Sequence, residues 1–320
     1  MTIEKQKLPH ESSRIFLTDG GLETDMIFNR EQTLPEFASH TLFNTAVGCR
    51  ELESYFRDYL DLARLCKTGF ILDTATWRAQ PGFADALGAS VEDLKQVNHL
   101  AVNFARRLQS LYSTQESPVL VNGVVGPWGD GYEASGDMTW QQAEAYHAQQ
   151  IGWLAEAGVD IISAITFTNA PEAIGFVKAA QRTEAGIVVS FTVETDGRLP
   201  TGQKLEAAID LVDAETGAAP AYFMVNCAHP SHFVDALTDG DWLQRLRGFR
   251  CNASRKSHAE LDACEVLDCG NPVELSQDYI NLLERVPHAN VFGGCCGSDI
   301  RHLDAIARRL TAETAAAHAG

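Results

Sequence analysis

The stretch IFLTDGGLET, residues 15–24, decides between two architectures for this chain. Its first five residues have the apolar, β-branched and aromatic character of a buried strand. The turn that follows begins Asp19-Gly20-Gly21 and lacks the G-x-G-x-x-G spacing that a doubly wound dinucleotide-binding sheet usually carries after its first strand. We therefore expect this strand to open a different α/β fold.

Seven further strand-like runs follow, separated by segments of helical period. The expected strands are 15–19, 69–75, 118–125, 159–166, 186–193, 221–227, 248–253 and 290–295. Strands that alternate with helices imply parallel strands joined by right-handed crossovers. Eight such units predict a single (β/α)8 barrel over residues 15–312, with an open doubly wound sheet as the rival. Residues 1–14 would form an N-terminal extension and residues 313–320 a frayed tail.

Helix signals fill the intervals between the strands. Ser90 and Thr139 begin helices as S-x-x-D and T-x-x-Q capping patterns. Asn169 caps a third helix, which we expect Gly186 to end. Apolar periodicity predicts the remaining helices over 50–67, 204–216, 231–247, 275–286 and 299–311.

Composition narrows the class of protein. The 43 acidic and 25 basic residues give a formal net charge of -18, which would repel nucleic acid and anionic membranes. The chain shows neither a secretory signal nor an apolar run long enough to cross a bilayer, so we expect a cytoplasmic protein. Its eight cysteines then indicate buried packing, metal binding or catalysis rather than a disulfide scaffold.

In a (β/α)8 barrel the functional groups lie at the carboxyl ends of the strands. Three cysteines fall at such ends: Cys227 after the sixth strand, and Cys295 and Cys296 after the eighth. Polar groups at other ends are candidate substrate contacts, namely Asp19, Asp73, Thr74, Glu194 and Asn252. Because the sixth and eighth strands are separated by one strand, Cys227 can reach the pair across the barrel mouth.

The stretch GGCCG, residues 293–297, has to turn two neighbouring thiols toward one target. Adjacent side chains on a strand point to opposite faces, so the backbone must leave strand geometry there, as its three glycines permit. Ser298 or Asp299 can cap the next helix, whose positive end favours thiolates. Three thiolates at one point require a cation, and Zn²⁺ with one open position fits best. The alternative is three small, buried residues that happen to lie at strand ends.

Four motifs together resemble the homocysteine S-methyltransferase family, zinc-dependent (β/α)8 barrels that methylate a thiol. They are D-G-G-L-E-T at 19–24, G-P-W-G at 126–129, V-N-C at 225–227 and G-G-C-C at 293–296. The resemblance covers nearly the whole chain. It implies that Cys227, Cys295 and Cys296 are the zinc ligands and that Asp19 helps to hold the amino acid part of the acceptor. It also implies methionine biosynthesis as the setting.

One departure from the family concerns the acceptor. Many members end the fourth strand with a glutamate that is associated with the amino group of homocysteine, whereas this chain has Ile165. Glu194, on the neighbouring strand, is a possible replacement, although it can equally be a solvated acid. Alternatives therefore remain: another small thiol or selenol as acceptor, or a thiol-rich metal-binding or redox-sensing protein without turnover.

The methyl donor is expected to be a sulfonium or a quaternary ammonium, and Trp128 can offer it an aromatic face. Small-molecule acceptor and donor are the expected partners, and the oligomeric state is left open. His147, in a Tyr-His pair that matches the family, is more typical of a packing residue than of a catalyst. His229 is expected in a loop rather than as a fourth ligand. Three other cysteines, Cys251, Cys264 and Cys269, lack a zinc spacing and are expected to be buried or free thiols.

Overall fold

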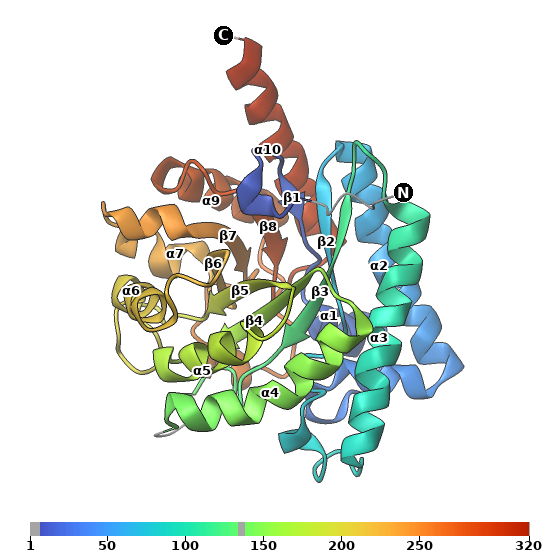
Figure 1. Ribbon diagram of the computed structural model, residues 1–320. Helices are drawn as coiled ribbons and strands as arrows, with labels where there is room; N and C mark the ends of the chain where they lie inside the picture. Colours follow the sequence, from blue (N-terminus) through green and yellow to red (C-terminus); the bar gives the residue numbers. More distant parts are fainter. Residues whose placement is uncertain (1–6, 134–137, 320) are drawn as a thin grey trace, which may run out of the picture.

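The strands form one closed barrel in chain order, and every neighbouring pair is parallel (Figure 1). This computed structural model describes residues 7–133 and 138–319, with side chains as far as residue 312. The strands are β1 (Phe16–Leu17), β2 (Gly69–Asp73), β3 (Val119–Val125), β4 (Ile161–Phe167), β5 (Gly186–Phe191), β6 (Tyr222–Asn226), β7 (Leu246–Cys251) and β8 (Val291–Gly294). The predicted (β/α)8 barrel is confirmed, and the doubly wound rival is wrong.

Helices surround the barrel on its outer face (Figure 1). The helices of the described residues are α1 (Leu22–Thr24), α2 (Ala46–Cys66), α3 (Val91–Tyr112), α4 (Trp140–Ala157), α5 (Ala170–Ala180), α6 (Leu205–Thr216), α7 (Pro230–Phe233), α8 (His258–Asp262), α9 (Pro272–Arg285) and α10 (Ile300–Ala319), of which α1 lies at the barrel mouth and α8 away from the ring. The capping patterns at Ser90 and Thr139 work as predicted, because each side chain accepts a hydrogen bond from the backbone three residues later.

Two helix predictions are wrong. Residues 231–247 do not form one helix: α7 ends at Phe233, short 3-10 turns follow, and β7 already begins at Leu246. Asp239-Gly240 interrupts the helical pattern there, as turn-forming residues do. Gly186 does not end α5, which stops at Ala180. It is instead the first residue of β5, where a side chain would collide with Leu8.

Two apolar layers stabilise the barrel. The larger lies between the strands and the surrounding helices. The smaller fills the barrel interior and includes Phe16, Ile71, Val188, Tyr222 and Val291. Because apolar side chains pack the interior, space for a ligand is left at the carboxyl ends of the strands.

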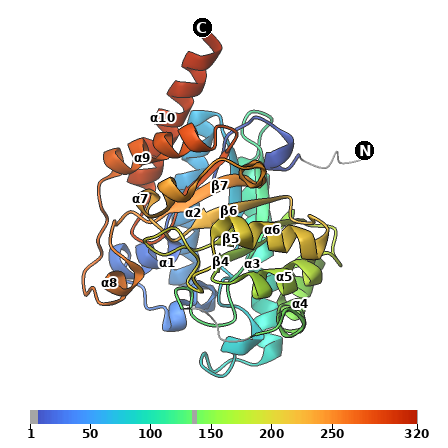
Figure 2. The same ribbon diagram turned by 90° about the vertical axis from the view of Figure 1, so that its left-hand side faces the viewer.

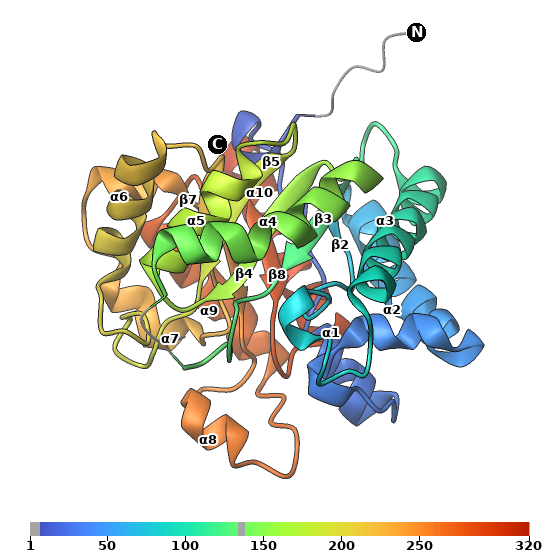
Figure 3. The same cartoon turned by 60° about the horizontal axis from the view of Figure 1, so that its bottom comes forward.

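Two segments extend from the compact body. The segment between β7 and α9, which contains α8, stands away from the barrel (Figures 2 and 3), and the end of α10 projects at the opposite end (Figure 2). Helix α10 includes most of the segment 313–320 that we expected as a tail, and the domain boundaries at 14/15 and 312/313 stay predictions. Within the ranges that the structure describes, every helix is too short or too polar to span a membrane.

Candidate active site

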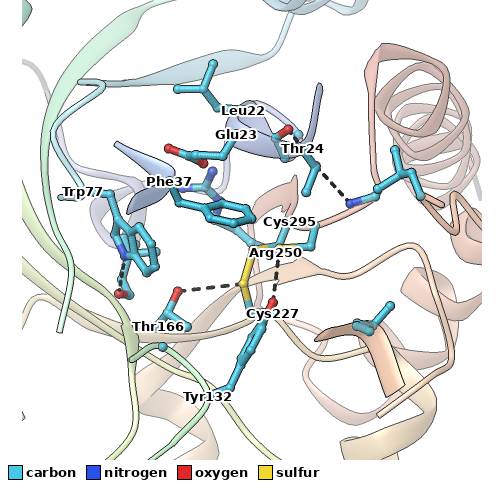
Figure 4. A pocket seen from close by; sticks show the side chains of 18 of the residues that line it. Leu22, Glu23, Thr24, Phe37, Trp77, Tyr132, Thr166, Cys227, Arg250 and Cys295 are labelled. Carbon is cyan, nitrogen blue, oxygen red and sulfur yellow. Dashed lines mark hydrogen bonds between the residues drawn. A yellow bond between two sulfur atoms is a disulfide. The ribbon is translucent and has the colours of Figure 1, made fainter. Parts of the chain in front are cut away.

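A cavity of about 450 Å³ lies at the carboxyl ends of the strands. Its wall includes residues near or just beyond the carboxyl ends of β1, β2, β3, β4, β6, β7 and β8, together with part of the α8 segment. Figure 4 shows Cys227, Cys295 and Arg250 near its centre, with Trp77, Phe37 and Tyr132 around them. This is the place at which a barrel enzyme of this architecture carries its chemistry.

Three cysteine sulfurs meet in this cavity. The Sγ atoms of Cys227, Cys295 and Cys296 lie within 4.8 Å of one another, and they form the one group of three or more potential metal ligands among the described residues. Cys227 and Cys295 are joined as a disulfide, whereas Cys296 is free and its Sγ lies 3.3 Å from the hydroxyl of Tyr132. The structure thus brings together the three residues that the sequence selected.

The position of Cys227 depends on its neighbour Asn226. The Asn226 side chain accepts hydrogen bonds from the backbone N–H of Thr166 (3.0 Å) and from the hydroxyl of Ser190 (2.6 Å), and donates one to the hydroxyl of Thr166 (2.7 Å). It therefore joins the ends of β4, β5 and β6. Cys227 and Thr166 both have positive φ angles, 55° and 65°, which is uncommon for such residues and typical of functional sites.

The GGCCG stretch leaves strand geometry at the cysteines, as predicted, but Gly293 and Gly294 do not take part in the turn. Gly293 and Gly294 are still part of the strand, and a side chain at Gly294 would collide with Ser298. The departure from strand geometry follows at the cysteines, and Gly297 has a φ of 78°. Asp299 then caps α10 by accepting a hydrogen bond from the backbone N–H of Arg301 at 2.9 Å. The positive end of α10 therefore follows the cysteine pair directly.

A buried arginine, Arg250 on β7, lies between two aspartates. Its guanidinium donates to Asp19 Oδ1 (2.6 Å) and to Asp73 Oδ2. Tyr55 donates to the second oxygen of Asp19 at 3.2 Å, and Asn122 to that of Asp73 at 2.7 Å. Burial, reinforced by the charge of Asp73, raises the pKa of Asp19 to about 7, although Arg250 opposes the shift. A second carboxylate beside the same guanidinium therefore makes Asp19 harder to ionise.

Arg250 was not predicted as a site residue, although the alternation of residues along β7 indicates its position. On β7 the residues on either side of it, Phe249 and Cys251, are apolar and belong to the layer beneath the helices. Alternation along a strand then directs the intervening arginine into the barrel interior. A buried cation requires anions, and two predicted site residues, Asp19 and Asp73, are available at neighbouring strand ends.

The remaining predicted substrate contacts lie in different places. Thr74 lines the cavity, and its hydroxyl accepts a hydrogen bond from the backbone N–H of Val124 at 3.1 Å. Glu194 and Asn252 are not among the lining residues. Asn252 donates to the carbonyl of Cys227 (3.0 Å), whereas Glu194 lies 3.2 Å from Nδ1 of His258. His258 Nε2 in turn bonds the same carbonyl at 2.6 Å. These groups surround the backbone of Cys227.

Position 165 carries no carboxylate. Ile165 lines the cavity, and its carbonyl accepts a hydrogen bond from Nε1 of Trp77 at 3.0 Å. Trp128, expected to face a cationic donor, is 45% exposed and is not a lining residue. The aromatic residues that line the cavity are Phe28, Phe37, Trp77 and Tyr132 instead.

The other residues considered from sequence have packing contacts. His147 is buried against Glu172 at 3.0 Å, and Nδ1 of His229, at the start of α7, lies 2.8 Å from the hydroxyl of Ser231. Cys251 is buried, Cys269 is half-buried, and Cys264 lies on the cavity wall. All three are free thiols, as expected.

Comparison with known proteins agrees with this geometry. A family model described as homocysteine S-methyltransferase matches residues 16–310. This chain belongs to the homocysteine S-methyltransferase family. It is therefore a methyltransferase, and the alternative of a protein without turnover is wrong.

Relatives and solved structures extend the comparison. A selenocysteine Se-methyltransferase from Brassica oleracea var. italica is 24% identical over 338 residues, which cover 95% of this chain and 91% of that protein. The homocysteine S-methyltransferase of Escherichia coli K12 is 28% identical over 151 residues, covering 43% of this chain and 48% of that one. The oxidized form of the E. coli homocysteine methyltransferase MmuM has a TM-score of 0.72 at 20% identity, over 95% of this chain and 100% of that chain. Its metallated form has the same TM-score and identity, over 93% and 97%. These structures share the fold.

Proposed function

We propose that this family member is a zinc-dependent enzyme that moves a methyl group from an onium donor to a small thiol. The observation that carries the proposal is the meeting of three cysteine sulfurs, within 4.8 Å of one another, on the wall of a substrate-sized cavity. Zinc–sulfur bonds of about 2.3 Å in a tetrahedral site place sulfurs about 3.8 Å apart, so these residues fit zinc after a small adjustment.

The donor set also has the right character. Cys227, Cys295 and Cys296 supply three soft ligands, and the cavity leaves the fourth direction accessible to a substrate, as in catalytic zinc sites. Cys227 and Cys295 bind as thiolates only when their disulfide is reduced. Both an oxidized and a metallated form of MmuM have been solved, which supports two such states in a relative with this fold. When bound, zinc lowers the pKa of a thiol in its open position and thereby supplies a thiolate at neutral pH.

The cavity suits a cationic donor. Seven carboxyl groups and two guanidinium groups line it: Asp19, Glu23, Glu36, Asp73, Asp130, Asp262 and Asp268, with Arg78 and Arg250. This excess of acids, together with the faces of Phe37 and Trp77, attracts a sulfonium or a quaternary ammonium. The bond from carbon to the onium atom breaks as the new carbon–sulfur bond forms, and the leaving group departs neutral with the electron pair. Because no proton has to be supplied, the protein contributes alignment and exclusion of water.

Homocysteine is the first acceptor to test, and methionine would then be the product. A second candidate, another small thiol or selenol, is favoured by Ile165, which offers no partner for an α-ammonium group. The similarity to a selenocysteine Se-methyltransferase also supports a test of selenols. A cytoplasmic location stays a prediction.

The proposal is tested with protein purified under reducing conditions. We expect about one zinc per chain, measured by metal analysis, and methyl transfer from a sulfonium or quaternary ammonium donor to at least one thiol of a panel. Cys295→Ala should lose both the metal and the activity. Cys66→Ala is the matched control, because Cys66 is a free thiol on α2 outside the cavity, and it should keep both. A Cys295→Ala variant with a full complement of zinc would contradict the ligand assignment.

A further inference from the structure

Arg78 is a buried guanidinium on the cavity wall, five residues after the end of β2. It is 7% exposed. Its central carbon lies 4.0 Å from the centre of the Trp77 ring and 4.4 Å from that of Phe83. Aromatic rings against a guanidinium leave its in-plane N–H groups available for hydrogen bonds. One of these, on Nη1, donates to the carbonyl of Gly129 at 2.6 Å.

The charge of Arg78 has no counter-ion in the part of the chain that the structure describes. No carboxylate there lies within 4.0 Å of its nitrogens, and its buried Nε has no hydrogen-bond partner. Arg250, the other guanidinium on the wall, is paired with two aspartates. Burial lowers the pKa of Arg78, and more distant acids such as Asp130 only partly offset this. Burying an unpaired cation is unfavourable, so its position indicates a partner that arrives with a ligand.

Arg78 lies close to Ile165, which stands where many family members have a glutamate. The Trp77 ring against which the guanidinium stacks donates its Nε1–H to the carbonyl of Ile165. Both Ile165 and Arg78 line the cavity that holds the three cysteines. Position 165 therefore offers no anion to an ammonium group, whereas Arg78 offers a cation that can receive an anion.

We propose that Arg78 binds the carboxylate of a substrate of the methyl transfer, through the N–H groups that are left free on its edge. A carboxylate matches the planar guanidinium fork in shape and charge. This inference rests on the proposed function. The carboxylate belongs either to the thiol acceptor or to the onium donor, since both enter this cavity, and the experiment has one arm for each.

The acceptor arm dissects homocysteine into its charged groups. 4-Mercaptobutyrate keeps the carboxylate and lacks the amino group, whereas 3-aminopropane-1-thiol keeps the amino group and lacks the carboxylate. The donor arm compares dimethylsulfoniopropionate, which has a carboxylate, with trimethylsulfonium, which has none. For Arg78→Met we expect KM for the carboxylate-bearing member of one pair to rise roughly 10- to 100-fold, with little change in kcat or in KM for its counterpart. Arg78→Lys should give a smaller rise, because lysine keeps the charge without the fork.

Folding and general effects are controlled separately. Thermal unfolding and zinc content of each variant show whether the fold and the metal site survive. Arg107→Met is the matched control, because Arg107 also stacks on an aromatic ring, that of Phe104, but lies outside the cavity. It should change none of the KM values. Equal changes for both members of each pair, or no change in any, would overturn the role of Arg78.

A binding measurement separates this inference from the proposed function. Calorimetry with 4-(methylthio)butyrate, the methylated form of 4-mercaptobutyrate, and with dimethylsulfoniopropionate requires no turnover. Wild-type protein should bind one of the two, with affinity reduced roughly 10- to 100-fold in Arg78→Met. If no thiol is methylated but this difference appears, the proposed function fails and the carboxylate site stands. If methylation proceeds and Arg78→Met binds both probes as the wild type does, the carboxylate site fails alone.

Discussion

Replacing Arg250 with methionine should destabilise the protein, and the loss should grow as the pH rises. Arg250 is buried and donates to both Asp19 and Asp73, so its removal leaves two carboxyl groups without the cation between them. Removing one partner of a buried ion pair costs about 3–5 kcal/mol. Because a domain is stable by only about 5–15 kcal/mol, this is a large fraction of the total.

The pH dependence follows from Asp19. Its pKa in the folded wild type is raised from 3.8 to about 7, chiefly by burial, although Arg250 opposes the shift. Protonated Asp19 therefore contributes its full stabilisation of the folded state below pH 3.8, the pKa in the unfolded chain. This contribution is lost as the pH rises toward 7, the pKa in the folded protein. Without Arg250 the folded pKa moves higher still, so the loss continues above pH 7. While Asp19 stays protonated in the variant and ionises in the wild type, the difference between the two free energies of unfolding should grow by about 1.4 kcal/mol per pH unit.

Urea denaturation of wild type and Arg250→Met at pH 6, 7 and 8 measures this difference. The double variant Arg250→Met with Asp19→Asn should recover part of the lost stability at pH 8, because one of the two facing carboxyl groups is gone. Arg107→Met, which removes a partly exposed pair with Glu53, is the control and should show almost no pH dependence. A difference between Arg250→Met and wild type that is the same at all three pH values would refute the reasoning.

Three further predictions concern the rest of the site. Asn226→Ala removes the hydrogen bonds that join β4, β5 and β6, so the free energy of unfolding in urea should fall by about 2–4 kcal/mol. Zinc binding, measured by competition with a chelator, should weaken, and unchanged zinc affinity would argue against a positioning role for Asn226. Burial lowers the pKa of His40 to about 4, so this group lowers the free energy of unfolding of the wild type by about 3 kcal/mol as the pH falls from 6.5 to 4. His40→Gln should lack that part of the acid sensitivity, and plots of unfolding free energy against pH that run parallel for the two proteins would contradict this. Oxidation with diamide should reduce the count of reactive thiols in unfolded protein from eight to six and prevent zinc binding until a reductant is added; oxidised protein that still binds zinc would exclude Cys227 and Cys295 as ligands.

The strands and the cysteine cluster could be predicted because their signals are local. Each of the eight predicted strands overlaps an observed one, since buried parallel strands are short apolar runs bounded by turns. Barrel closure then determines which strand ends meet. Cys227 and the pair at 295–296 are separated by nearly seventy residues in sequence, yet they follow from counting strands.

The contacts of Arg250 could not be derived in the same way. Arg250 is separated from Asp19 by 231 positions in the sequence and from Asp73 by 177. The geometry of these contacts depends on side-chain conformations, which a local sequence pattern does not predict. Glu194 and Asn252 show another limit. Alternation predicts which way a residue points only while the chain is a strand, and β5 ends at Phe191 and β7 at Cys251. Both residues lie beyond those ends, so the alternation does not apply to them.

Different parts of the cavity govern the reaction and the substrate. Family membership and the three sulfurs concern the methyl transfer itself, whereas identities of 24–28% with the relatives leave the acceptor to be argued from the lining residues. Two of these, Ile165 and Arg78, contact the same tryptophan, Trp77. Ile165 removes a negative charge that many family members carry there, and Arg78 adds a positive one. A proposal for the acceptor must therefore explain both the absence of a carboxylate at position 165 and the presence of the unpaired Arg78 guanidinium. Homocysteine carries both an ammonium and a carboxylate: Ile165 leaves the first to the other acids of the cavity, whereas Arg78 can pair the second.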